Sequence, residues 1–349
     1  MQAHALTPRL VAALETNMSL SHSWQSLSTE PAQSTYPIHV KPDFPFLSVL
    51  ASGGHTLLIH SAALTEHRIM GSTSDSAIGD CLDKIARLVL PIDVLQETKN
   101  IMYGAMLENF AFSQDRHLRS NEACTSGKPI AQTQSGVVFE NDSARQYRQK
   151  YEAYYTYRAP KNQEEAFHRN VSRWGWSFNQ PLAKGAGCLK NNSLEMSFSG
   201  LTAAVQRAIQ YEFDQSTGKL TKIERSPKHI SLEERRDMAQ CAMRAAFEHL
   251  AGRVALALRE CPVSTVVMAG GVAANSYLRY ILASILCANG HDEVKLVFPP
   301  PSLCCDNAAM IAWAGIEMYQ TGTTDQLNIR AVRKWPLDQL LSPPMEKTT

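Results

Sequence analysis

The chain has 349 residues, of which 44% are hydrophobic, and its formal net charge is +1. This length suffices for two lobes or one large domain, and the composition argues against a disordered chain. Balanced charge neither favours nor excludes nucleic acid, so any basic surface must be local. The eight cysteines include no CxxC pair, which argues against a disulfide framework or a zinc knuckle and favours a reducing compartment. No apolar run approaches the roughly 18–20 residues of a membrane span, and the start lacks a secretory signal pattern; no membrane partner is expected.

The first part of the chain predicts a helix, a loop and a three-stranded meander. Residues 1–15 have the spacing of an amphipathic helix, and residues 16–45, rich in Ser, Thr, Pro and Gln, predict a loop. Strands are expected at 46–51, 56–62 and 67–73, the first two joined by a Gly-Gly turn. A helix is expected over 75–89.

Residues 109–195 interrupt this pattern with a polar, aromatic and basic stretch. Between 141 and 190, nine Lys and Arg stand against four Asp and Glu. The stretch predicts an insertion, partly helical, or a mobile lid. Its aromatic and basic side chains can stack on and neutralise RNA, or they can be solvated side chains of a lid, and both interpretations stay open.

The remaining chain alternates helices and strands. Helices are expected at 202–213 and from a capping box of Ser231 and Glu234 to about residue 259. A buried strand at 263–269 precedes a glycine turn and a helix that ends before Gly290. A strand at 294–298 and a helix from Asp306 to residue 319 follow. This alternation indicates an α/β fold.

Two glycine pairs are candidate anion-binding turns. In Ser52–Thr56, paired glycines let backbone N–H groups converge on a phosphate, although a tight hairpin turn alone explains them as well. In Ala269–Asn275 the glycines lie between a strand and a helix start, where free N–H groups and the helix dipole suit a phosphate. Asn275 there can hydrogen-bond a base or sugar, or the segment can be a helix start without a ligand.

Three further residues are ambiguous by themselves. Asp306 follows a Pro-rich stop and precedes a helix, so it suits an N-cap and also a metal ligand. Asp83 can pair with Lys84 on a solvated face or accept from ribose hydroxyls. His4, alone on its helix, suits a surface or packing role more often than a ligand role.

Five segments in order resemble the tRNA N6-adenosine threonylcarbamoyltransferases of the bacterial and mitochondrial type. They are LASGGHTLLI, DSAIGDCLDKIARL, MSFSGLTAAV, VVMAGGVAANSYLR and CCDNAAMIAWAG. The resemblance implies an α/β fold of the actin-like ATPase and sugar-kinase-like kind. It implies transfer of a threonylcarbamoyl group from threonylcarbamoyl-AMP to N6 of the adenosine beside the anticodon in tRNAs that read ANN codons. It also implies one divalent metal ion, iron or zinc, a mitochondrial location, and tRNA as partner, with a homodimer left open.

The resemblance also assigns site residues by motif. The metal ligands would be His4 and Asp306. The substrate-binding residues would be Leu50, Ala51, Ser52, Gly53, Gly54, Asp83, Gly104, Glu108, Ala274, Asn275 and Cys305. Two positions depart from the family pattern: Tyr103 replaces a glycine before Gly104, and Cys305 replaces a Thr or Ser hydroxyl.

The family's first lobe and first metal histidine would lie before Met1, so the chain is expected to lack most of that lobe. The expected division is 1–45 as its remnant with a loop, 46–108 as the glycine hairpin and helix segment, 109–195 as the insertion, 196–335 as the rest of the nucleotide-binding lobe, and 336–349 as a tail. Alternatives are an inactive RNA- or partner-binding fragment, an actin-like ATPase or sugar kinase, and a metalloprotease, the last disfavoured because no HExxH occurs.

Overall fold

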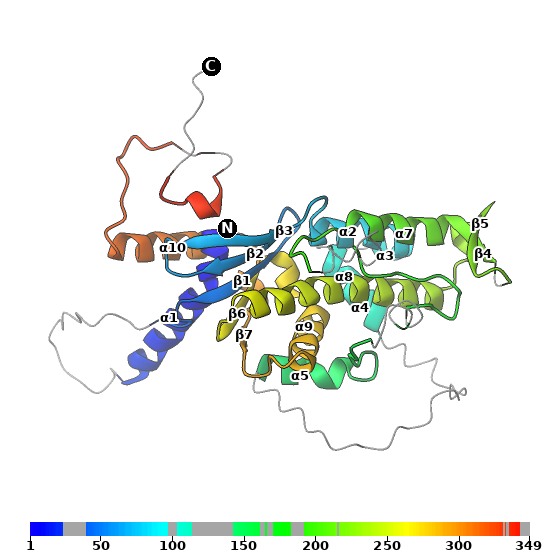
Figure 1. Cartoon of the computed structure of the whole chain (residues 1–349), viewed down its shortest axis with the longest axis horizontal. Coiled ribbons are helices and arrows are strands. Elements are labelled where there is room, and N and C mark those ends of the chain that lie inside the picture. Colours follow the sequence, from blue (N-terminus) through cyan, green and yellow to red (C-terminus); the bar gives the residue numbers. More distant parts are fainter. Residues whose placement is uncertain are drawn as a thin grey trace.

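The computed structural model describes residues 1–23, 40–96, 103–113, 142–160, 165, 170–182, 192–214, 216–330, 332 and 335–342. A mixed five-stranded sheet in the order β3-β2-β1-β6-β7 lies at its centre (Figure 1). The strands are β1 (Phe46–Ala51), β2 (Thr56–Ser61), β3 (His67–Ser72), β6 (Thr265–Ala269) and β7 (Lys295–Val297). The first three form an antiparallel meander, and β1 pairs in parallel with β6, as β6 does with β7. The sheet confirms the predicted α/β class.

Strand β1 is buried along its whole length because both faces of the sheet are covered. Its alternate residues Leu47, Val49 and Ala51 belong to the main core, which also includes residues of the helices. Leu50 points the other way and packs with Leu57, Ile59 and Leu337 in a smaller cluster. The continuous apolar sequence of this strand follows from this two-sided burial.

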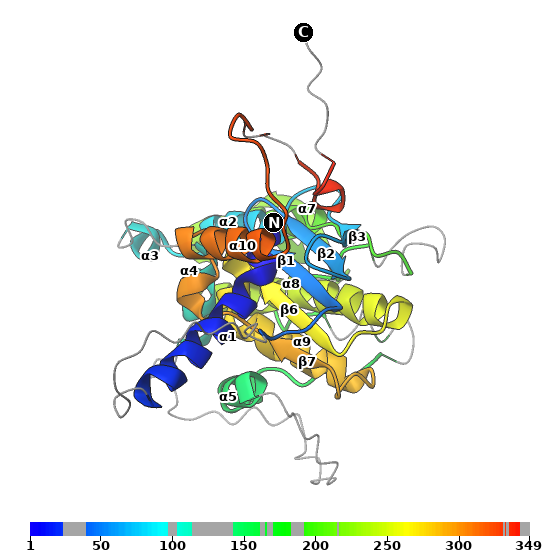
Figure 2. The same ribbon diagram turned by 90° about the vertical axis from the view of Figure 1, so that its left-hand side faces the viewer.

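Helices α1 (Gln2–Ser23) and α10 (Ala308–Gln320) pack on each other at one end of the sheet (Figure 2). The Arg9 side chain joins them, since its Nε lies 2.8 Å from Glu317 Oε1 and its Nη1 donates to the carbonyl oxygens of Val40 and Pro42. No helix within the described residues is both long and apolar enough to cross a membrane.

The other helices surround α8 (Leu232–Glu260), which contacts α2 (Ile78–Val89), α4 (Tyr103–Phe112), α7 (Ser199–Gln210) and α9 (Ser276–Ala288). Figure 1 shows this group at the end of the sheet away from α1 and α10. With neighbours on several sides, α8 buries residues all around its circumference. The remaining elements are α3 (Ile92–Gln96), α5 (Asp142–Tyr151), the hairpin β4 (Tyr211–Asp214) and β5 (Lys219–Glu224), and short 3-10 turns at 227–229, 271–274, 301–303 and 337–339.

The described parts of the polar segment between α4 and α7 are packed against the core. Helix α5 contacts α9, and Tyr151, Tyr155, Trp176 and Phe178 are buried. Buried carboxylates of α8 hold this segment: Tyr155 Oη donates to Glu248 at 3.0 Å, and Trp176 Nε1 donates to Glu234 at 3.2 Å. Much of the basic stretch, including 161–164 and 183–191, lies outside the described residues.

Several predicted boundaries are wrong. Helix α1 continues to Ser23, where a loop is predicted, while 24–39 lie outside the described residues. The helix predicted over 202–213 runs from Ser199 to Gln210 and gives way to strand β4, because the chain turns there into a hairpin with β5. Helix α2 begins at Ile78 rather than 75. The predicted capping box is half formed: Ser231 accepts from the Glu234 N–H, but the Glu234 carboxylate binds Trp176 and Arg225 instead.

Candidate functional site

The turn between β1 and β2 is closed by its own serine. Ser52 Oγ accepts hydrogen bonds from the N–H groups of Gly54 at 3.3 Å and His55 at 3.0 Å. Both glycines have open space where a side chain would project. Phosphate binding by this turn therefore stays a prediction, since two of its N–H groups already have a partner within the turn.

The same turn caps the start of α2. The Ile78 N–H donates to Thr56 Oγ1 at 2.8 Å, and the Gly79 N–H donates to Ser52 O at 3.1 Å. A side-chain carbon on Gly79 would lie 2.7 Å from both Gly53 N and Ser52 O. Glycine at 79 thus lets the helix start touch the turn, and the turn satisfies N–H groups that a side-chain cap would otherwise take.

The second glycine turn lies against the end of β1. Gly270 has a φ of +93°, and a side-chain carbon there would meet Ala51 O at 2.4 Å. Both constraints require glycine. Asn275, which follows the 3-10 turn Gly271–Ala274, caps α9 by accepting from the Leu278 N–H at 3.0 Å. The parallel pairing of Leu50 with Ala269 brings the two turns together at the carboxyl edge of the strands, where α/β sheets bind ligands.

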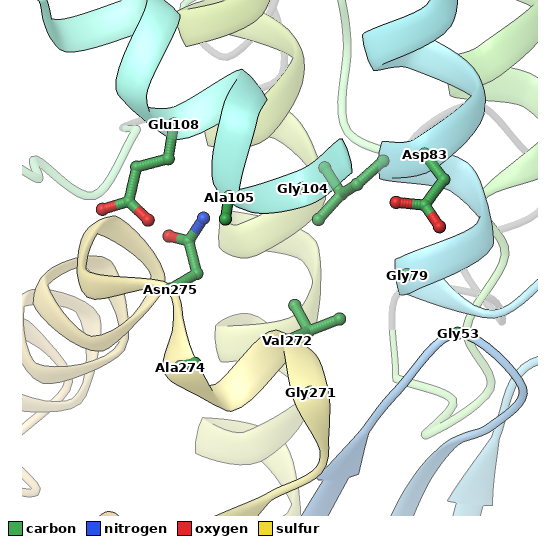
Figure 3. A pocket seen from close by; sticks show the side chains of 11 residues that line it. Gly53, Gly79, Asp83, Gly104, Ala105, Glu108, Gly271, Val272, Ala274 and Asn275 are labelled. Atoms are coloured by element: carbon green, nitrogen blue, oxygen red, sulfur yellow. The ribbon is translucent and has the colours of Figure 1, made fainter. Parts of the chain in front are cut away.

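A cavity of about 240 Å³ lies between these turns and helices α2 and α4 (Figure 3). Its lining comes from four segments: Gly53 from the first turn; Gly79, Leu82 and Asp83 from α2; Gly104, Ala105 and Glu108 from α4; and Gly271, Val272, Ala274 and Asn275 from the second turn.

The polar groups of this cavity differ in their environment. Burial raises the pKa of Asp83, while the Gly104 N–H and the Arg87 charge oppose that rise. Asn275 is 7% exposed, and its buried Nδ2 has no hydrogen-bond partner among the residues that the structure describes. A buried amide donor without a partner is costly, so Nδ2 is free to donate to an acceptor that enters the cavity.

His4 and Asp306 meet although they are far apart in the chain. His4 Nε2 lies 2.7 Å from Asp306 Oδ1, and His4 Nδ1 is buried with no hydrogen-bond partner in the described part of the chain. Burial lowers the pKa of His4, and the hydrogen bond to Asp306 opposes this. A neutral imidazole beside a carboxylate is a donor pair suited to zinc or iron. No group of three or more candidate metal-binding side chains occurs in the part of the chain that the structure describes.

Asp306 is not the N-cap that its position predicts. Asn307 caps α10, since its Oδ1 accepts from the Met310 N–H at 3.0 Å. The Asp306 side chain is instead 90% exposed and contacts His4. Asn307 therefore takes the capping role, and the Asp306 carboxylate contacts His4 instead.

A model of the tRNA N6-adenosine threonylcarbamoyltransferase family matches residues 31–162 and 141–313. The chain belongs to this family. It is 31% identical over 308 residues to the mitochondrial tRNA N6-adenosine threonylcarbamoyltransferase of Schizosaccharomyces pombe, covering 86% of this chain and 56% of that relative. Two proteins named tRNA N6-adenosine threonylcarbamoyltransferase, without the mitochondrial label, are also similar. The one from Rickettsia canadensis is 27% identical over 297 residues, which cover 85% of this chain and 63% of the relative. The one from Methylocapsa acidiphila is 26% identical over 343 residues, which cover 97% of this chain and 64% of the relative. The chain thus spans less than two thirds of the length of each of these relatives.

Only some of the residues in the threonylcarbamoyltransferase motifs meet at the cavity. Among the residues predicted from the resemblance, the cavity is lined by Gly53, Asp83, Gly104, Glu108, Ala274 and Asn275. Ser52 and Gly54 lie in the adjoining turn, and Ala51 ends β1 beneath Gly270. Leu50 points into the small cluster on the other face of the sheet. Cys305 is half-buried beside Asp306, where burial raises its pKa. The surface pair predicted for Asp83 is wrong, because Lys84 binds Asp80 at 2.7 Å.

Sequence reasoning missed two residues that position this family's motifs. The Asp75 carboxylate accepts hydrogen bonds from Ser197 Oγ at 2.6 Å and the Phe198 N–H at 2.9 Å, and so ties the SFSG segment to the start of α2. Burial would raise the pKa of Asp75, but these hydrogen bonds and those from Ser199 lower it well below its usual range.

Arg279 is the second missed residue, and it joins the two halves of the site. It is 4% exposed; its Nε donates to Ala273 O at 2.7 Å and its Nη2 donates to Pro299 O at 3.0 Å. One guanidinium thus fixes the second glycine turn relative to the loop that leads to Asp306. The sequence did not indicate this role, because Arg279 stands in the first turn of a helix and its partners lie outside that helix.

Proposed function

We propose that this chain takes part in transferring a threonylcarbamoyl group from threonylcarbamoyl-AMP to N6 of the adenosine beside the anticodon in tRNAs that read ANN codons. Family membership supports the reaction. The cavity supports nucleotide binding. Asn275 Nδ2, buried at the cavity without a hydrogen-bond partner among the described residues, is the observation that carries the proposal.

The cavity suits an adenylate on chemical grounds. The carboxylates of Asp83 and Glu108 accept hydrogen bonds from ribose hydroxyls, which would compensate for the burial that raises the pKa of Asp83. Asn275 Nδ2 donates to an acceptor of the base or sugar. In the transfer, the N6 amine attacks the carbamoyl carbon, the bond from that carbon to the phosphate oxygen breaks, and AMP leaves with N6 losing a proton.

His4 and Asp306 would hold the divalent metal ion, iron or zinc, that the family resemblance implies. Their 2.7 Å contact and the lowered pKa of His4 fit a shared cation, because a neutral imidazole is ready to coordinate. When bound, such an ion supplies Lewis-acid polarisation of phosphate and acyl oxygens. Removing either residue should weaken binding of Zn²⁺ or Fe²⁺ measured by calorimetry, and His4→Ala and Asp306→Ala should act alike.

The proposal also covers the acceptor molecule, the location in the cell and self-association. tRNA is proposed as the acceptor because the family is named for the modification of tRNA. A mitochondrial location is proposed because the similar fission-yeast protein carries that designation in its name. Self-association into a homodimer is also proposed, and sedimentation measurements test it.

The decisive experiment incubates the purified 349-residue chain with threonylcarbamoyl-AMP and an unmodified ANN-decoding tRNA. The modified nucleoside is then measured by mass spectrometry. AMP binding, measured in parallel, reports on the cavity alone, and the same assay on a chain extended upstream of Met1 reports on the contribution of any preceding sequence. Absence of product from every form would refute the transferase assignment, and tRNA binding without transfer would favour a binding role.

A further inference from the structure

Helix α5, which lies outside the five sequence motifs, supplies a tyrosine that contacts a residue lining the cavity. Tyr151 is fully buried, and its ring packs against Phe112 and Tyr277 with centroid distances of 4.8 and 5.0 Å. These contacts fix the orientation of the ring, and its hydroxyl points toward Glu108 of helix α4. A buried phenol in such a cluster needs a polar partner.

That partner is the cavity residue Glu108. Tyr151 Oη donates to Glu108 Oε1 at 2.5 Å, and Ser276 Oγ donates to the same oxygen. Lys150 Nζ lies 3.7 Å from it as well. Burial first, and then the charge and hydrogen bond of Glu108, raise the pKa of Tyr151, so the phenol keeps its proton and acts as donor.

All of these contacts use one carboxylate oxygen. Among the described residues no hydrogen bond to Glu108 Oε2 is found, although the side chain is only 7% exposed. Figure 3 shows the Glu108 carboxylate beside the amide of Asn275 at the cavity. Ser276 directly follows Asn275, so the same contacts join α4, α5 and the start of α9 around this end of the cavity.

We propose that Tyr151 is a positioning residue: its hydroxyl holds Glu108 by Oε1 so that Oε2 faces the cavity and accepts a hydrogen bond from a hydroxyl group of the bound nucleotide. This inference rests on the proposed function, in which the cavity binds an adenylate. It assigns the segment around α5 a part in substrate binding, distinct from any contact with RNA. A carboxylate already bound by one oxygen loses less side-chain freedom when a ligand binds.

Phenylalanine at 151 tests this, because Tyr151→Phe removes the hydroxyl and keeps the ring. The matched control is Tyr155→Phe, since Tyr155 belongs to the same aromatic cluster but donates to Glu248, which does not line the cavity. The measurements are the Kd of AMP by calorimetry, thermal unfolding, and crystal structures of the ligand-free proteins. Tyr151→Phe should weaken AMP binding about tenfold, because ligand binding must then also order the Glu108 side chain. Tyr155→Phe should leave it unchanged.

A double-mutant cycle separates positioning from packing. With Glu108→Gln already present, Tyr151→Phe should have little further effect on AMP binding. Equal weakening by the two tyrosine variants, or a Glu108 side chain that keeps its position in the Tyr151→Phe crystal, would overturn the proposal. If the unaltered chain binds no AMP but Glu108 shifts in Tyr151→Phe, the positioning role stands and the proposed function fails.

Discussion

Replacing Gly79 by alanine tests the contact between the first glycine turn and helix α2. The added carbon would lie 2.7 Å from Gly53 N and Ser52 O, which are backbone atoms that cannot rotate away. Overpacking of this kind costs about 1–3 kcal/mol, and the better helix propensity of alanine returns up to about 1 kcal/mol. The free energy of unfolding should therefore fall by about 1–2 kcal/mol. AMP binding should also weaken, because the turn must move.

Gly252 supplies the matched control. It lies inside α8, is exposed, and has nothing within 4 Å of an added side-chain carbon. Gly252→Ala should stabilise the protein by about 0.5–1 kcal/mol through helix propensity alone. Urea unfolding of both variants gives the comparison. A Gly79→Ala protein as stable as the unaltered chain, with AMP binding intact, would refute the contact.

Three further predictions concern a buried histidine, a buried ion pair and the Asn275 amide. Burial first, and then the charge of Arg253, lower the pKa of His249 to about 3, while Asp75 opposes this. Because the unfolded chain then binds a proton more readily than the folded protein, the free energy of unfolding should fall by about 2 kcal/mol between pH 6.5 and 4.5. Urea unfolding should not find this loss in the His249→Gln variant. Arg9→Met leaves Glu317 buried without its cation and should lower the free energy of unfolding by about 3 kcal/mol, with part recovered by adding Glu317→Gln; no recovery would contradict the pairing. Asn275→Ser keeps a cap for α9 but removes the Nδ2 donor, so calorimetry should show about tenfold weaker AMP binding with unfolding changed by less than about 1 kcal/mol.

Local sequence patterns predicted the parts of the fold that depend on neighbours in the chain. The meander follows from apolar runs around Gly53 and Gly54, and the second turn follows from glycines between a strand and a helix. Gly290, with a φ of +77°, lies just beyond the end of α9 as predicted. Each of these features is decided within a few residues.

Contacts between distant segments were not predictable in this way. Asp75 opens the helix predicted over 75–89, yet its partners lie at 197–199. Asp306 suited an N-cap by position, but Asn307, one residue later, also has an N-cap side chain and occupies the capping position. Tyr151 lies in a polar, basic stretch whose composition hides the aromatic cluster that buries it. For Asp75 and Tyr151 the deciding partners are remote in sequence, whereas the capping position is decided between two adjacent residues that both suit it.

The parallel pairing of β1 with β6 has a consequence for how the protein is made. Leu47 pairs with Val266, so the cavity beside the two glycine turns cannot form until most of the chain has left the ribosome. The β1–β2–β3 meander pairs locally and can form long before that, with one edge of β1 still open. That edge carries the apolar sequence FLSVLA, the kind of exposed strand that recruits other chains. Variants that delay the second glycine turn should therefore be lost mainly to aggregation during synthesis, before any effect on nucleotide binding can be measured.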